Sequence, residues 1–257
     1  PLRCCYEQYL YTNRNTRYHS APNKIPKVRE KRVMKYQWIL FDADETLFHF
    51  DAYQGLKLMF SRFNVDFSVQ DFDHYQLVNK PLWVDYQDGK ISAAELQSTR
   101  FEMWAEKLGV TATRLNSEFL IAMADICSLL PGARELVDAL SGKVNMGIIT
   151  NGFTELQTIR LERTGLKNVF SPLIISEQVG AAKPDVAIFE HAFNLMNNPA
   201  KENILMVGDN LHSYIQGGIN AGIDTCWRNT SGAVADDNIA PRYQVSSLAE
   251  LQKLLLA

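Results

Sequence analysis

Short apolar runs that end at polar or glycine-containing turns and are followed by helical patterns constrain the fold of this chain most strongly. The clearest runs lie at residues 38–41, 144–150, 173–176, 204–207 and 225–228. Buried strands that alternate with helices are typical of a parallel sheet with helices on both faces. The sequence therefore predicts an α/β fold, in which ligands bind beyond the carboxyl ends of the strands.

A long insertion separates the first apolar run from the second. Far more residues lie between positions 41 and 144 than one crossover helix needs. Ser68 and Ser92 are each followed three residues later by an acidic residue, the pattern of a helix capping box. Further along, apolar residues recur at helical spacing, at Leu96, Met103, Trp104 and Leu108. We predict a helical cap domain over residues 50–130 and a core formed by residues 34–49 and 131–257, with the cap able to close over a ligand.

The first 33 residues differ in charge from the rest of the chain. They hold eight Lys or Arg and two Glu, so that residues 34–257 carry a formal charge of -9 while the whole chain carries -3. No apolar secretory core follows these basic residues, although an Arg-rich, acid-poor start also fits an organelle transit peptide. We interpret residues 1–33 as a basic extension outside the fold and Met34 as a natural start.

Composition argues against several classes of protein. No apolar run approaches the roughly 20 residues that cross a bilayer, so no membrane span is expected. Beyond residue 33, basic residues do not cluster with aromatic ones, which argues against a nucleic-acid polymer as partner. The four cysteines contain no C-x-x-C, so neither a disulfide framework nor a zinc site is indicated. This cysteine usage favours a reducing, cytoplasmic location, and nothing indicates the oligomeric state.

Two carboxylates, Asp42 and Asp44, follow the first apolar run. The first can attack phosphorus to form an aspartyl-phosphate, while the second protonates the leaving oxygen and later takes a proton from water. A divalent cation would neutralise these carboxylates together with the phosphoryl oxygens. Taken alone, the pattern D-x-D-x-T more often marks a solvated acidic turn that caps a helix.

Three further residues suited to phosphate chemistry follow other apolar runs. Thr150 can donate a hydrogen bond to a phosphoryl oxygen, Lys183 can balance negative charge, and Asp209 offers oxygen ligands to Mg²⁺. Each has an ordinary alternative, namely a helix N-cap, a surface lysine and a turn aspartate. Because the carboxyl ends of parallel strands meet at one edge of a sheet, their convergence with Asp42 is the main evidence for a phosphate-handling site.

Taken together and in this order, the motifs resemble the haloacid dehalogenase superfamily of phosphohydrolases. They are D-x-D-x-T at 42–46, a threonine after a strand at Thr150, Lys183-Pro184, and V-G-D at 207–209 followed by G-G-I-N-A-G. Segments 41–48, 78–87 and 148–153 are similar to the bacterial pyrimidine 5'-nucleotidase branch. The resemblance covers nearly all of residues 35–257. It implies a Rossmann-like core with a helical cap, and an Mg²⁺-dependent phosphatase of pyrimidine nucleoside 5'-monophosphates such as UMP, dUMP and dTMP.

The resemblance also implies roles for the core residues. Asp42 would be the nucleophile and a Mg²⁺ ligand, and Asp44 the general acid/base whose backbone carbonyl also binds the metal. Asp209 would complete the protein's metal ligands. Three residues would act on the phosphate, which Thr150 and Asn151 would bind and Lys183 would orient. Dehalogenases act on carbon and need no aspartate at position 44, so Asp44 favours cleavage of a phosphate ester.

One position departs from the family's pattern. The family continues its fourth motif with a second aspartate five residues after the first, and this chain has Tyr214 there. A phenol with a pKa near 10 is neutral at pH 7. We therefore predict weaker Mg²⁺ binding, with Asn210 or Ser213 as partial substitutes. His212 is an alternative ligand, but imidazole suits softer metals.

Substrate specificity is expected to come from the cap, because the core contacts mainly phosphate. Four cap residues are candidates for contacting the base or the sugar, namely Asn79, Lys80, Trp83 and Tyr86. The alternative is that the aromatic residues pack inside the cap, which we favour for Trp104.

Two other functions remain open from the sequence. One is a phosphatase or phosphomutase of the same superfamily that acts on a sugar phosphate. The other is a binding protein that keeps the fold and has lost turnover, for which Tyr214 is the motivation.

Overall fold

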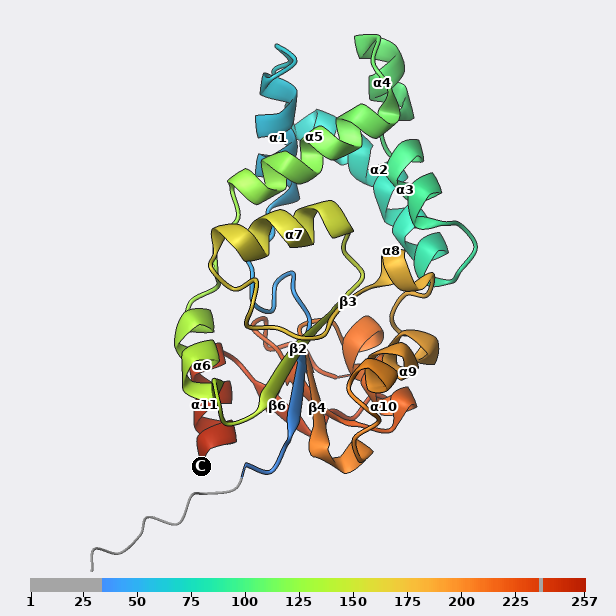
Figure 1. The fold of residues 1–257 in the computed structure, drawn as a ribbon. Helices are drawn as coiled ribbons and strands as arrows, with labels where there is room; N and C mark the ends of the chain where they lie inside the picture. Colours follow the sequence, from blue (N-terminus) through green and yellow to red (C-terminus); the bar gives the residue numbers. More distant parts are fainter. Residues whose placement is uncertain (1–33, 236–237) are drawn as a thin grey trace, which may run out of the picture. The chain divides into compact units, whose positions relative to one another are not determined.

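A six-stranded sheet forms the centre of the structure, a computed structural model that describes residues 34–235 and 238–257 (Figure 1). All neighbouring strands are parallel, in the order β3-β2-β1-β4-β5-β6. The strands are β1 (Trp38–Phe41), β2 (Asn145–Thr150), β3 (Leu173–Ile175), β4 (Ile204–Gly208), β5 (Asp224–Arg228) and β6 (Tyr243–Val245). The α/β prediction is confirmed, all five expected strands are present, and β6 is an addition. The predicted basic extension, residues 1–33, lies outside the described residues.

Strand β1 lies at the point where the sheet changes winding direction. Phe41 pairs in register with Ile148 of β2 on one side and with Val207 of β4 on the other. In a sheet of this order the two halves of the chain wind away from the centre in opposite directions, which leaves a crevice beyond the carboxyl ends of β1 and β4. The residues that follow these two strands, Asp42 and Asp209, therefore begin at that crevice.

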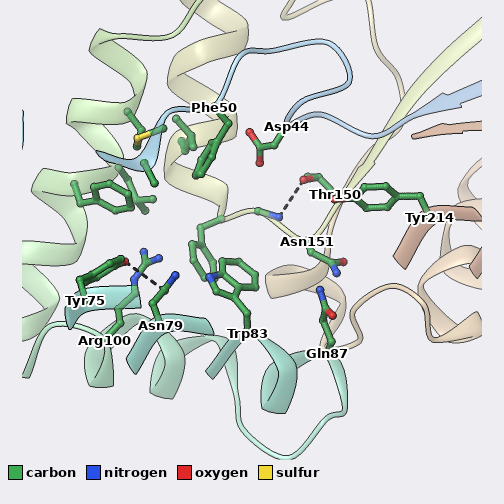
Figure 2. Close-up of a pocket in the computed structure, with 17 residues that line it drawn as sticks. Asp44, Phe50, Tyr75, Asn79, Trp83, Gln87, Arg100, Thr150, Asn151 and Tyr214 are labelled. Carbon is green, nitrogen blue, oxygen red and sulfur yellow. Dashed lines mark hydrogen bonds between the residues drawn. The ribbon is translucent and has the colours of Figure 1, made fainter. Parts of the chain in front are cut away.

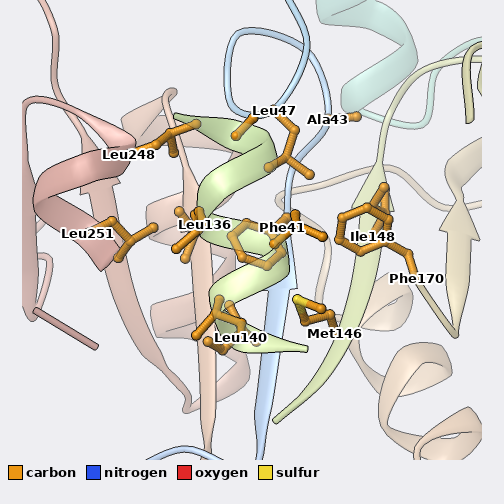
Figure 3. Close-up of a cluster of buried hydrophobic side chains, with 14 of the residues drawn as sticks. Phe41, Ala43, Leu47, Leu136, Leu140, Met146, Ile148, Phe170, Leu248 and Leu251 are labelled. Carbon is orange, nitrogen blue, oxygen red and sulfur yellow. The ribbon is translucent and has the colours of Figure 1, made fainter. Parts of the chain in front are cut away.

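Helices cover both faces of the sheet. The helices outside the insertion are α6 (Ala133–Leu140), α7 (Thr154–Arg163), α8 (Ser176–Val179), α9 (Val186–Leu195), α10 (Gly217–Ala221) and α11 (Leu248–Leu256), with a 3-10 turn η1 (Lys201–Asn203) and a π-helical turn η2 (Leu211–Gln216). Phe41 and Ile148 pack with α6 and α11 on one face (Figure 3). Leu40 and Ile149 pack with α9 on the other face. Because both faces are buried, the strands consist of continuous apolar runs.

Five helices are inserted between β1 and α6. They are α1 (Ala52–Ser61), α2 (Val69–Gln87), α3 (Ala93–Thr99), α4 (Glu102–Leu108) and α5 (Ala112–Asp125). Both predicted capping boxes are present, at Ser68 and at Ser92. The inserted helices form their own hydrophobic cluster, in which Trp104 packs 4.4 Å from Phe60 between ring centres, as favoured for this tryptophan. The boundaries of a separate cap domain at 50 and 130 stay a prediction.

Among the described residues, none of the helices has both the length and the apolar character that crossing a bilayer requires.

Candidate active site

Asp42 follows β1 directly and is 1% exposed. Its backbone N–H donates to the carbonyl of Val207 at 2.9 Å, which extends the β1–β4 pairing beyond the strand. One carboxylate oxygen, Oδ1, lies 2.9 Å from Lys183 Nζ, and Thr46 Oγ1 donates to the other over 3.4 Å. Contacts to both carboxylate oxygens therefore fix this side chain at the strand tip.

Lys183 reaches Asp42 from the loop that follows α8, and its side chain is fully buried. Its ammonium group also donates to the carbonyl oxygen of Ile149. Burial raises the pKa of Asp42 and lowers that of Lys183, while the attraction between the two charges opposes both shifts. A buried pair of this kind is costly to break, because either partner alone would be an uncompensated charge.

Asn151 holds the Lys183 loop in place. Its Nδ2 donates to the carbonyl of Lys183 at 2.9 Å, and its Oδ1 accepts from the backbone N–H of Lys183 at 2.8 Å. Both ends of the amide are therefore engaged. To contact phosphate as expected, Asn151 can therefore use only the second N–H of its side-chain amide or its backbone N–H.

Thr150 ends β2 and is 1% exposed. Its Oγ1 accepts from the backbone N–H of Gly152 at 3.0 Å, which closes a tight turn. A Cβ atom on Gly152 would lie 2.5 Å from Gln157 Nε2 and 3.2 Å from Thr150 Oγ1. Only glycine lets the turn approach both side chains this closely.

Asp44 pairs with Arg160 of α7, a residue that the sequence reasoning missed. Arg160 is 1% exposed, and its Nε and Nη2 donate to Gln157 Oε1 at 3.0 and 2.6 Å. Its guanidinium carbon lies 4.4 Å from the centre of the Phe48 ring. These contacts hold Arg160 rigidly, and through it the carboxylate of Asp44. No local motif marks the residue, because its position depends on how α7 packs against the loop after β1.

Asp209 follows β4 and brings a second carboxylate toward Asp42. Trp227 Nε1 donates to its backbone carbonyl at 2.7 Å. Burial and then the nearby Asp42 carboxylate raise the pKa of Asp209 to about 7. A cation bound between two such carboxylates relieves their repulsion.

The oxygen donors at this crevice suit a hard cation. Among residues 34–235 and 238–257, no group of three or more His, Cys, Asp or Glu side chains is arranged to hold a metal ion. The candidate donors are therefore the carboxylates of Asp42 and Asp209, with the backbone carbonyl of Asp44 that the resemblance implies. Such a set fits Mg²⁺, which is commonly held by one or two carboxylates and keeps several waters.

Tyr214, on η2, lies beside the Asp42–Lys183 pair. Its ring packs against the backbone at the end of β4, where a Cβ on Gly208 would be 2.6 Å from Tyr214 Cβ. Lys183 Nζ is 3.8 Å from the ring centre. Burial, followed by the Asp42 carboxylate, raises the pKa of the Tyr214 phenol well above its usual value. The phenol therefore stays neutral and adds no charge to the site.

The expected substitutes for the missing carboxylate already have partners. Asn210 Oδ1 accepts from the backbone N–H of Ser213 at 2.9 Å, and Ser213 Oγ accepts from Gln87 Nε2 over 3.4 Å. His212 is exposed. Their roles toward a metal stay predictions.

A cavity of about 180 Å³ begins at Asp44, Thr150, Asn151 and Tyr214 and extends toward the inserted helices (Figure 2). Much of its remaining wall is aromatic, and that wall includes Phe50, Tyr75, Trp83, Phe119 and Phe153. Asp42, Lys183 and Asp209 do not line it. Of the residues expected to handle phosphate, the cavity thus connects Asp44, Thr150 and Asn151 to an apolar compartment.

Helix α2 presents one stripe of side chains to this cavity. Four residues that are four positions apart line it, namely Tyr75, Asn79, Trp83 and Gln87. Positions i and i+4 lie on one face of a helix. Their spacing from Asn79 and Trp83 could therefore have placed Tyr75 and Gln87 on the same face, but the sequence analysis did not identify these two residues. Of the four cap candidates, Asn79 and Trp83 line the cavity. Lys80 is exposed, and Tyr86 donates from its hydroxyl to Ser176 Oγ at 2.7 Å outside the cavity wall.

Comparisons with known proteins agree with this architecture. A family profile described as haloacid dehalogenase-like hydrolase matches residues 36–222. The chain belongs to this family, as the resemblance predicted. It is 54% identical to the pyrimidine 5'-nucleotidase YjjG of Escherichia coli over 86% of this chain and 99% of that protein. It is 36% identical to the pyrimidine 5'-nucleotidase PynA of Streptococcus pneumoniae over 85% of this chain and 94% of that protein.

A solved structure shares the fold over most of this chain. The HAD-hydrolase YfnB of Bacillus subtilis, whose crystal structure is described as bound to magnesium and as showing interdomain movement, superposes with a TM-score of 0.75 at 30% identity. The match covers 87% of this chain and 100% of that one.

Proposed function

We propose that this hydrolase is an Mg²⁺-dependent phosphatase of pyrimidine nucleoside 5'-monophosphates. One observation carries the proposal: the residues that follow β1 and end β2 place the Asp44 carboxylate and the Thr150 hydroxyl at one end of a small, largely aromatic cavity, and the buried Asp42–Lys183 pair lies at the same strand tips. The polar groups suit a phosphoryl group, and the aromatic wall of the cavity suits a flat ring. The two pyrimidine 5'-nucleotidases to which the chain is similar support the choice of substrate.

In the proposed reaction, a carboxylate oxygen of Asp42 attacks phosphorus, and the ester P–O bond to the nucleoside breaks. Asp44 gives a proton to the departing 5' oxygen, so that the nucleoside leaves as an alcohol. Asp44 then takes a proton from water, whose oxygen attacks the phosphorus of the aspartyl-phosphate. This second step releases inorganic phosphate and restores Asp42.

The remaining residues bind and orient the phosphoryl group. Thr150 Oγ1 can donate to a phosphoryl oxygen. Lys183 orients the carboxylate of Asp42 and balances the negative charge that the phosphate brings. A bound Mg²⁺, held by Asp42, Asp209 and the backbone carbonyl of Asp44, would neutralise phosphoryl oxygens. Asn151 acts on the reaction through Lys183, since its side-chain amide is engaged with the backbone of that residue.

Release of inorganic phosphate tests the proposal. The parent protein is assayed at saturating Mg²⁺ on UMP, dUMP, dTMP and a hexose phosphate, next to Asp42→Asn, which keeps the shape of the side chain and removes the negative charge that makes its oxygens nucleophilic. We expect preference for the nucleotides and a loss of at least about 1000-fold in the variant, as for other nucleophile substitutions. Preference for the hexose phosphate would favour the sugar-phosphate alternative instead. Equal activity in the two proteins would leave catalysis by Asp42 without support.

A further inference from the structure

A buried guanidinium lies at the end of the cavity opposite the phosphate-handling residues. Arg100, the C-cap residue of α3, lines the cavity and is 5% exposed (Figure 2). Its Nε donates to Asn116 Oδ1 at 3.0 Å, and its Nη2 donates to the same oxygen. Within residues 34–235 and 238–257 it forms no ion pair with a carboxylate, unlike Arg160.

The surroundings of Arg100 offset only part of the cost of burying its charge. The guanidinium carbon lies 5.2 Å from the ring centres of Phe101, Phe119 and Phe153, and aromatic faces attract a cation. A guanidinium has five N–H donors, of which Asn116 takes two and the Tyr75 hydroxyl is a further neighbour. Asn116 and Tyr75 together leave N–H groups that can donate to an acceptor in the cavity, whose wall Arg100 lines.

We propose that Arg100 reads the base of the substrate, donating to the carbonyl oxygen at position 4 of uracil or thymine. This inference rests on the proposed nucleotidase function. The cavity of about 180 Å³ is smaller than the roughly 300–1000 Å³ typical of sites for drug-sized ligands, so it suits a single-ring base. Trp83 and Phe153, with ring centres 5.4 Å apart and planes 29° apart, supply flat surfaces for that ring.

The chemistry of Arg100 discriminates between pyrimidines. Uracil and thymine present an acceptor oxygen at position 4, whereas cytosine presents an amino donor there. Arginine has no acceptor, so cytosine would place two donors against each other in a buried site. A substrate carboxylate could use the same N–H groups. The proposed nucleotide substrates carry no carboxylate, so we choose the base carbonyl.

Steady-state kinetics on Arg100→Met test the proposal, because methionine fills similar space among aromatic rings without donating hydrogen bonds. The substrates are UMP, CMP and ribose 5-phosphate, the last having phosphate and sugar but no base. We expect kcat/KM for UMP to fall by about 10- to 100-fold, the loss of one charge-assisted hydrogen bond. The ratio of kcat/KM for UMP to kcat/KM for CMP should fall toward one, and kcat/KM for ribose 5-phosphate should change little.

Two further variants complete the experiment. Lys107→Met removes a positive charge from α4 at an exposed site away from the cavity, and we expect the UMP-to-CMP ratio of the parent. Arg100→Gln keeps an N–H donor for Asn116, which protects the fold if Arg100→Met is unstable. The carbonyl of this glutamine can accept from the amino group of cytosine, so CMP should be retained better than UMP.

The outcomes separate this proposal from the proposed function. A parent that hydrolyses ribose 5-phosphate but not UMP would refute the nucleotidase function and this inference with it. A parent active on UMP whose UMP-to-CMP ratio is unchanged in both Arg100 variants would overturn the base-reading role alone. An equal fall for all three substrates would make Arg100 a structural residue. A carboxylate-bearing phosphate ester is assayed beside these substrates, and a loss of activity confined to it would overturn the base-reading role and assign Arg100 to an anion.

Discussion

At the scale of single residues, the site consists of reactive side chains and the side chains that hold them. Lys183 is positioned by Asn151, and Asp44 is positioned by Arg160. The sequence marks Lys183 and Asp44, because they lie in motifs that follow strands. Arg160 comes from a distant helix and has no motif of its own. The geometry of the site therefore depends on contacts that only the folded chain provides.

Removing Arg160, which positions Asp44, should impair turnover more than substrate binding. In Arg160→Met we expect kcat to fall by about 10- to 100-fold with KM little changed, because a charge-assisted hydrogen bond contributes about 1.5–3 kcal/mol. Arg163→Met, at the end of the same helix and 47% exposed, is the matched control and should keep kcat. Kinetics on folded protein, checked by circular dichroism, measure both. A rise in KM at constant kcat would contradict a positioning role.

Tyr214 should limit the affinity for Mg²⁺. Tyr214→Asp adds a unit charge beside Asp42 and Asp209, which is worth at least about 1 kcal/mol near a cation even in water. We expect Mg²⁺ to raise the thermal unfolding midpoint of this variant at concentrations roughly tenfold lower than for the parent. Tyr214→Asn has similar shape without the charge and serves as control. The same Mg²⁺ dependence in all three proteins would show that Tyr214 has no such effect.

At the scale of elements, close approach between helix and sheet fixes the region that follows Asp209. Gly218 of α10 faces β5, and a Cβ atom there would lie 2.6 Å from Thr225 Cγ2 and 3.4 Å from Met206 Cβ. A helix can lie this near the strands only where it lacks a side chain. The turn η2, which carries Tyr214, leads directly into α10, so this packing also limits where Tyr214 can lie.

A pair of substitutions tests this packing. Gly218→Ala should lower the free energy of unfolding by about 1–3 kcal/mol, the usual cost of overpacking. Thr225→Ser removes the methyl group that the new Cβ would meet. In that background the same Gly218→Ala change should cost close to nothing, since alanine also favours the helix by about 1 kcal/mol. Urea unfolding of the four proteins gives the coupling, and an equal loss in both backgrounds would exclude the clash with Thr225.

At the scale of the whole molecule, sequence patterns predict the sheet better than the site. Five strands were predictable because continuous apolar runs end at polar turns. β6 was not, since only Val245 is buried among its three residues. The motif residues were predictable because strand tips converge. Arg100 and Arg160 were not, because an arginine on a helix has no signal until distant side chains surround it.

The stability of the molecule should depend on pH through an ion-pair network that joins the inserted helices to the core. Asp125 at the end of α5 contacts Arg62, which caps α1, and Arg163 of α7. Burial raises the pKa of Asp125, but Arg163 and Arg62 outweigh it and hold this pKa below the usual 3.8. A depressed pKa means that the stabilisation is complete above about pH 4 and is lost as the pH falls through the folded-state value.

Asp125→Asn should therefore lower the free energy of unfolding at pH 7 by about 0.5–1 kcal/mol, a modest value because the pairs are partly exposed. The difference from the parent should shrink at pH 3, where the carboxyl is mostly protonated in the unfolded chain, and also in high salt, which screens the pairs. Urea unfolding at a series of pH values measures this difference in the free energy of unfolding. Asp138→Asn, at an exposed position on α6, is the control and should stay within about 0.5 kcal/mol of the parent at every pH. A deficit for Asp125→Asn that is as large at pH 3 as at pH 7 would mean that the side chain stabilises the protein by packing, because protonation removes the charge and leaves the shape.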